Sequence, residues 1–204
     1  MVELSEMERD MLAEVGNIGA GHASNALSRM VGKQVDMSVP SASIVPISQL
    51  PDEVDNGEDI VTGIYVPVSG DLQGGVMLIL PHRSALKLAD ELMDREIGTA
   101  SRLSEMDKSS LKEVGNILVG HCLTALSTFL RMDLQEDVPE IASDSAMALM
   151  DTIAAEFSQE AEHALKIDEF MSIESELELK FSFFLIFSLE DAEGVISKIK
   201  EQVK

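Results

Sequence analysis

Two groups of polar residues could each place a carboxylate and an amide on one face of a helix. Each group has an aspartate or serine, then a glutamate, then an asparagine: Asp10, Glu14 and Asn17 in the first group, and Ser109, Glu113 and Asn116 in the second. The spacing i, i+4, i+7 brings the three side chains of a group into one stripe along a helix. The glutamate is an acceptor that carries a negative charge, whereas the amide both donates and accepts hydrogen bonds. Small residues follow each stripe, so another surface can approach it closely.

The two stripes belong to an internal duplication with a period of 99 residues. Residues 4–40 and 103–139, compared at this offset, share 17 identities in 37 positions without a gap, and the last identity pairs Pro40 with Pro139. A period of this length is too long for a solenoid repeat. It predicts two half-domains, 4–95 and 103–204, related by a pseudo-two-fold axis and fused into a single domain that spans residues 1–204.

Both copies begin with the same helix-start pattern. Ser5 with Glu8, and Ser104 with Asp107, have the spacing of a capping box, in which two side chains satisfy the free backbone groups of the first helical turn. We therefore expect two long repeated helices that end near residues 31 and 130. Met7, Met11 and Met30 are most simply interpreted as core residues of the first of these helices.

The rest of the chain predicts an α+β fold with a central antiparallel sheet of about six strands and extra helices. Expected strands are 33–38, 42–45, 60–69, 72–80, 133–138, 163–173 and 177–187, and expected shorter helices are 83–93 and 143–159. The segment 143–159 has no helical counterpart in the first repeat. An insertion in one copy of a duplication is either an added partner surface or a cover for the edge of the sheet.

Composition excludes several classes of function. The formal net charge of −22 repels phosphate backbones and acidic membranes, so we expect neither nucleic-acid binding nor membrane insertion. No apolar run is long enough to cross a bilayer and the start is unlike a secretory signal, so the expected location is the cytoplasm. Cys122 is the only cysteine and is expected in the core. No metal-ligand spacing occurs, so we expect no metal site and no cofactor of the protein's own.

At this point the residues resemble a known family. The spacing D/S-x3-E-x2-N-x22-P, present twice without a gap, is similar to the signature of the CheC/CheX/FliY phosphatases of the chemotaxis system. The resemblance covers essentially the whole chain. Two intact copies and the inserted helix are most similar to the CheC type.

The resemblance implies an enzyme, a hydrolase that removes the phosphoryl group from the phosphoaspartate of the response regulator CheY. It further implies that Asn17 and Asn116 orient the attacking water, while Glu14 and Glu113 pair with a lysine of the regulator. Asp10 and Ser109 would support these residues, and Pro40 and Pro139 would shape the neighbouring strand. The regulator would bring the Mg²⁺ ion. Such a sparse site is sufficient because phosphoryl transfer mainly requires positioning and charge stabilisation.

A second function remains open beside the enzyme. The resemblance also implies binding to the receptor deamidase CheD, and the chain could be a non-catalytic module that regulates this partner. The surface expected for CheD is the inserted helix, with Asp144, Met147, Met150 and Asp151. We expect the protein to be a monomer.

Overall fold

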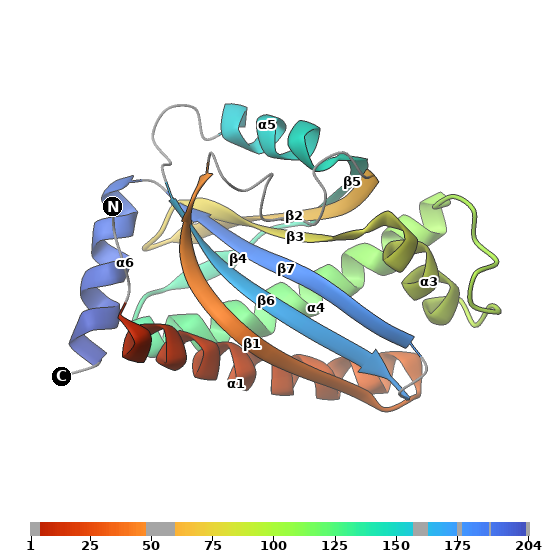
Figure 1. Ribbon diagram of the computed structural model, residues 1–204, viewed down its shortest axis with the longest axis horizontal. Helices are drawn as coiled ribbons and strands as arrows, with labels where there is room; N and C mark the ends of the chain where they lie inside the picture. The colour runs from red at the N-terminus through yellow and green to blue at the C-terminus, as the bar shows by residue number, and fades with distance from the viewer. Residues whose placement is uncertain (1–4, 48–59, 157–162, 175–176, 188, 203–204) are drawn as a thin grey trace.

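A seven-stranded antiparallel sheet separates two long crossing helices from a shorter helix on its other face (Figure 1). The computed structural model describes residues 5–47, 60–156, 163–174, 177–187 and 189–202. The described helices are α1 (Glu6–Val31), α3 (His82–Leu92), α4 (Glu105–Leu130), α5 (Ala146–Glu156) and α6 (Leu189–Gln202). The described strands are β1 (Val35–Pro46), β2 (Ile60–Gly70), β3 (Gly74–Pro81), β4 (Leu134–Glu136), β5 (Glu140–Ser145), β6 (His163–Ile173) and β7 (Leu177–Phe187). The predicted α+β class with a central antiparallel sheet is confirmed.

The two long helices repeat each other residue by residue. Each has 26 residues, and each begins with the predicted capping box, at Ser5 in α1 and at Ser104 in α4. Each is also followed by a residue in the left-handed conformation, Gly32 after α1 and Arg131 after α4. The helix ends expected near residues 31 and 130 are therefore confirmed. The 99-residue offset holds for the backbone as well as for the sequence.

The repeats exchange their first strands. The sheet order is β1-β6-β7-β3-β2-β4, with β5 also paired to β2. Strand β1 of the first repeat thus pairs with the hairpin β6–β7 of the second, while β4 and β5 of the second repeat pair with the hairpin β2–β3 of the first. The hairpin of each repeat is therefore flanked by a strand that comes from the other repeat.

The strand that follows each long helix differs between the repeats. Strand β1 is continuous over 12 residues, where the sequence predicted two shorter strands, and its pairing with β6 is irregular between Ser38 and Ser41. The equivalent segment of the second repeat is divided into β4 and β5, and the division contains Pro139. The sequence analysis missed β5 and α6. The expected helix 143–159 begins only at Ala146, and residues 157–159 lie outside the described residues.

The main core lies between the sheet and the long helices. A Cβ added to Gly16 would lie 3.1 Å from the Val39 side chain of β1, and one added to Gly115 would lie 2.7 Å from Ile64 of β2. These two glycines therefore let the sheet approach each helix closely. Among the described residues, α4 is the one helix long and apolar enough to cross a membrane by length and composition. Its buried residues, which include Leu111 and Leu126, belong to this core.

The expectation that the methionines of α1 fill the core is wrong for two of the three. Met7 is 61% exposed and Met30 is 39% exposed, whereas Met11 is half-buried. Core positions on this helix are taken instead by small or branched residues, for example Leu12, Ala20 and Leu27. Small residues suffice because the glycines bring the sheet close to the helix.

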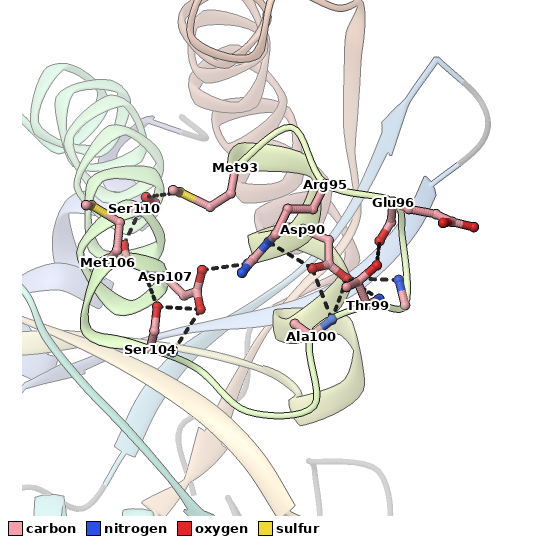
Figure 2. A network of polar contacts seen from close by, with 11 residues as sticks. Asp90, Met93, Arg95, Glu96, Thr99, Ala100, Ser104, Met106, Asp107 and Ser110 are labelled. Atoms are coloured by element: carbon pink, nitrogen blue, oxygen red, sulfur yellow. Dashed lines mark hydrogen bonds and ion pairs between the residues drawn. The ribbon is translucent and has the colours of Figure 1, made fainter.

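A polar network fixes the start of α4 (Figure 2). Asp90 is fully buried and accepts hydrogen bonds from the backbone N–H groups of residues 98–100. Arg95 forms ion pairs with Asp90 (Nε–Oδ1, 3.1 Å) and with Asp107 (Nη2–Oδ1, 2.6 Å), and Asp107 closes the capping box with Ser104. Burial opposes the charge on Asp107, but the hydrogen bonds from Ser104 and the pairing with Arg95 hold its pKa below the ordinary value. The network anchors the linker between the repeats to the helix that carries the second stripe.

One ionisable side chain is buried without a full set of partners. Glu169 of β6 is 0% exposed and lies opposite the irregular part of β1. The Cys122 thiol of α4 donates to its Oε1 at 3.4 Å, while its Oε2 is buried and has no hydrogen-bond partner. Burial raises the pKa of Glu169 to about 7, although the hydrogen bond from Cys122 acts in the opposite direction. Burial also raises the pKa of the Cys122 thiol well above its ordinary value.

We predict that Glu169 makes the protein less stable as the pH rises. Its folded pKa of about 7 lies above the ordinary value of 4.5, so the folded state binds more protons between these two values. Stability from this group is therefore fully present below pH 4.5 and is lost as the pH rises through 7. The loss amounts to about 3 kcal/mol in the free energy of unfolding. Denaturant unfolding from pH 5 to pH 8 should show this fall in the natural protein and not in Glu169→Gln.

The matched control is Glu178→Gln, which removes an exposed carboxylate on the neighbouring strand β7. This variant should keep the pH dependence of the natural protein. A pH profile of Glu169→Gln that runs parallel to the natural one would contradict the buried, raised pKa.

Candidate functional site

Each polar stripe lies along the seam between a long helix and the strand that follows it. Glu14 and Glu113 are exposed, and so are the residues one turn earlier, Asp10 and Ser109. Asn17 and Asn116 are half-buried, because their side of the helix borders the strand. The spacing i, i+4, i+7 predicted one shared stripe for the three side chains of a group. The structure instead directs the glutamate to solvent and sets the asparagine at the edge of the sheet.

In the first repeat, the asparagine is hydrogen-bonded to the strand. Asn17 Oδ1 accepts from the Val39 N–H at 2.9 Å, and Asn17 Nδ2 donates to the Val39 carbonyl at 3.3 Å. Val39 precedes Pro40 at the point where β1 shifts its register against β6. Proline has no N–H and interrupts the ladder, so the backbone groups beside it need other partners. The amide of Asn17 supplies both partners.

In the second repeat, the asparagine faces a hollow. A depression of about 430 Å³ lies beside α4, and its lining is mostly polar, with three carboxylates and one lysine: Ser109, Lys112, Glu113, Asn116, Glu136, Asp137, Val138 and Pro139. Among the described residues, Asn116 makes no hydrogen bond equivalent to those between Asn17 and Val39. The N–H of Val138, the counterpart of Val39, is instead bonded to Asp137 Oδ1 at 2.7 Å.

The difference between the two seams follows from the divided strand. Val39 is buried at 4% exposure, whereas Val138 is 70% exposed and lies between β4 and β5. Val138 therefore does not take the place that Val39 has in the first repeat, and Ile64 of β2 packs against Gly115 instead. The hollow brings Ser109, Glu113, Asn116 and Pro139 to one surface.

Sequence reasoning missed the residues on the far wall of this hollow. Glu136, Asp137 and Val138 come from the segment just before Pro139. The position of Pro139 within the repeated spacing was the available clue, because a proline that ends a strand leaves its neighbours outside the ladder.

The described residues contain no group of three or more histidine, cysteine, aspartate or glutamate side chains that could hold a metal ion. The two repeated histidines meet where the long helices cross, with 6.1 Å between the ring centroids of His22 and His121. Cys122 is 1% exposed, so the predicted core position is confirmed. A chemical role for either stripe therefore depends on its carboxylate, its amide and the groups that a bound partner supplies.

The surface expected from the inserted helix is only partly on that helix. Asp144 is exposed but belongs to β5, which corrects its expected place at the helix start. Met147 and Asp151 are exposed on α5, and the side chain of Met150 lies outside the described part of the chain. On the opposite side of α5, Leu149 packs against the sheet.

Comparison with known proteins finds one family model that matches a segment of each repeat. A model of the CheC-like family matches residues 7–44 and 106–140, two segments that begin at equivalent positions of the repeats. The chain is 34% identical over 186 residues to "CheY-P phosphatase CheC" of Bacillus subtilis (strain 168), which covers 90% of this chain and 89% of that protein.

Two solved structures share the fold. The crystal structure of Thermotoga maritima FliY has a TM-score of 0.79 at 22% identity, and the match covers 99% of this chain and 100% of that one. The CheX–CheY–BeF3–Mg²⁺ complex from Borrelia burgdorferi gives a TM-score of 0.52 at 16% identity, covering 86% of this chain and 97% of the matched chain. Sequence identity to the Bacillus protein and the match of both repeats to the family model lead to one conclusion: this chain belongs to the CheC-like family.

Proposed function

We propose that the protein hydrolyses the phosphoaspartate of the chemotaxis response regulator CheY, at one or both of the Glu-x2-Asn stripes. The observation that carries this proposal is the pair of equivalent stripes in a chain 34% identical to a CheY-P phosphatase. A solved structure of similar fold contains CheX together with CheY, BeF3 and Mg²⁺. We expect the protein to act as a monomer in the cytoplasm.

The asparagine would hold the attacking water. Its amide can accept from and donate to a water molecule without repelling the oxygens of the phosphoryl group. The water oxygen forms a bond to phosphorus while the bond from phosphorus to the aspartate oxygen breaks. The aspartate leaves as a carboxylate, and the phosphate product keeps both protons of the water. Because this transition state is loose, holding the water in line is most of what a catalyst must add.

The glutamate would hold the regulator. Glu14 and Glu113 are exposed, so an incoming lysine can reach either one without displacing protein. The regulator would bring that lysine and Mg²⁺, which together offset the charge on the phosphoryl oxygens. The protein itself would need no cofactor. Asp10 and Ser109 border the same face one turn earlier and would support the contact.

The two stripes differ in how freely their asparagines can act. Asn116 borders an open hollow, whereas the Asn17 amide already uses its oxygen and one N–H on Val39. Asn17 retains one lone pair and one N–H for a water molecule. We therefore assign the larger share of the activity to the second stripe.

A second role, regulation of the deamidase CheD, rests on the inserted segment. Met147 is 56% exposed on α5 and lies between the exposed carboxylates Asp144 and Asp151. Because α5 covers the face of the sheet opposite α1 and α4, a partner bound there would leave both stripes accessible (Figure 1).

We predict that the asparagines account for the activity. The double variant Asn17→Ala with Asn116→Ala should lower the rate of CheY dephosphorylation on the order of 100-fold, because each site loses its positioned polar group. Asn116→Ala alone should remove more than half of the activity, and Asn17→Ala less than half. Decay of phosphorylated CheY, timed with each variant, measures these rates. Asn25→Ala, the same change at an exposed position further along α1, should be as active as the natural protein, and an active double variant would refute the mechanism.

The same two single variants should differ in stability. Asn17→Ala leaves the backbone N–H and carbonyl of Val39 without their partners, which should cost about 2 kcal/mol in the free energy of unfolding relative to Asn116→Ala. Any gain in helix propensity is common to both variants and cancels in the comparison. Denaturant unfolding of the two proteins gives the difference. Equal stabilities would show that the Asn17 hydrogen bonds do not hold the irregular part of β1 in solution.

We predict that the glutamates determine affinity for the regulator. Glu14→Gln with Glu113→Gln should weaken binding of BeF3-activated CheY about tenfold and make binding less sensitive to salt, because the paired charges are lost. Titration at two ionic strengths measures both effects. The control, Glu174→Gln with Glu178→Gln, removes the same charge from exposed positions on or beside other strands. If the control weakens binding equally, the effect belongs to net charge and not to the stripes.

A further inference from the structure

Exposed apolar side chains gather beside the two stripes. Nine large apolar residues are exposed among the described residues, and four of them border a stripe: Met7 and Ile18 on α1, Met106 on α4, and Val138 at the edge of the hollow. Met7 and Met106 are 61% and 64% exposed. Single exposed apolar residues are common on a soluble protein, so the informative feature is the position of these side chains relative to the stripes and not their exposure alone.

The two methionines are equivalent by the duplication and lie in line with the glutamates. Met7 is seven residues before Glu14, and Met106 is seven residues before Glu113. Seven residues make about two helical turns, so each methionine lies on the same helix face as its glutamate and about 10 Å nearer the start of the helix. Each repeat therefore has an exposed methionine at the same position relative to the glutamate and asparagine of its stripe.

Packing does not explain this repetition. Among the positions that α1 and α4 share, buried ones such as Leu12 and Leu111 keep an apolar residue because they pack on the sheet. Met7 and Met106 keep the same residue type although most of each side chain is in contact with solvent. An unbranched thioether side chain can adapt its shape to a partner surface.

We propose that Met7 and Met106 are apolar anchors for the response regulator, one at the N-terminal end of each stripe. This inference rests on the proposed function and extends it from chemistry to recognition. The occupant is the regulator itself, because the anchor continues the face that presents the glutamate and the asparagine. The regulator should present an apolar side chain about 10 Å from the lysine that meets the glutamate.

Charged residues lie next to each apolar anchor. Met7 is flanked by exposed Glu6 and Asp10, and Met106 by exposed Glu105, whose carboxylate is paired with Lys108 Nζ at 2.8 Å. An apolar centre surrounded by charged residues has the arrangement of a small interface hot spot with a polar rim. Such a contact exists both before and during the reaction, so it contributes to binding and not to the chemical step.

The experiment replaces both methionines by glutamine, which keeps the length of the side chain and removes its apolar character. For Met7→Gln with Met106→Gln, the KM for phosphorylated CheY should rise about tenfold while kcat stays unchanged, the pattern for loss of uniform binding. Titration with BeF3-activated CheY should show the same loss in affinity. Thermal unfolding should be unchanged because both side chains are exposed.

The matched control is Met30→Gln, at an exposed methionine of α1 about six turns from Met7. It should leave KM, kcat and affinity as they are in the natural protein. An unchanged KM in the double variant, while the natural protein dephosphorylates CheY, would overturn the anchors and leave the proposed function standing. A fall in kcat at constant KM would also overturn them. Failure of the natural protein to act on CheY would instead refute the proposed function.

Discussion

The structure depends on where the backbone N–H and carbonyl groups next to each repeated proline find hydrogen-bond partners. Each of these prolines lies in the segment that follows a long helix. Glycines at positions 16 and 115 bring the sheet against the helices at this level. Val39 is buried there, so its backbone groups next to Pro40 must find partners within the protein, whereas Val138 next to Pro139 is exposed. In the first repeat the amide of Asn17 is that partner. In the second repeat the segment leaves the helix and Asp137 takes the free N–H. Whether each asparagine amide is bonded to the backbone is therefore determined by the strand that follows the helix and not by the helix itself.

Charge determines what kind of partner protein can bind at the stripes. A chain with a net charge of −22 that exposes a glutamate on each stripe favours a partner that brings positive charge. The second stripe is less uniformly negative, because Lys112 also lines its hollow and Lys108 lies one turn earlier. A phosphorylated partner carries negative charge at its phosphoryl group. Positive groups of that partner must outweigh this charge at the surface that contacts the glutamate. Exposed apolar residues beside the stripes supply attraction that does not depend on charge.

Most of the elements could be predicted from the sequence because the duplication let each helix confirm the other. The capping boxes and the hairpins were visible as local patterns. The exchange of strands was not, because an offset between repeats does not say which hairpin a strand joins. Strand β5 and the irregular pairing at Val39 also depend on contacts with β2 and β6 far away in the chain. The buried Glu169 had a local clue, since it takes an inward position in the alternation of β6 between Ile167 and Met171.

Site residues were predictable in type and spacing, but their environments were not. A helical projection of α1 puts Asn17 and Glu14 together, yet Asn17 contacts β1 and Glu14 contacts solvent. Met7 was assigned to the core by its residue type alone, although its angular position on the helix matches that of Glu14. The two sites differ although both repeats share one sheet, because the Asn17 amide is bonded to Val39 while Asn116 borders an open hollow. Duplication within a single fold thus permits one copy to contribute to stability while its sister keeps an open surface.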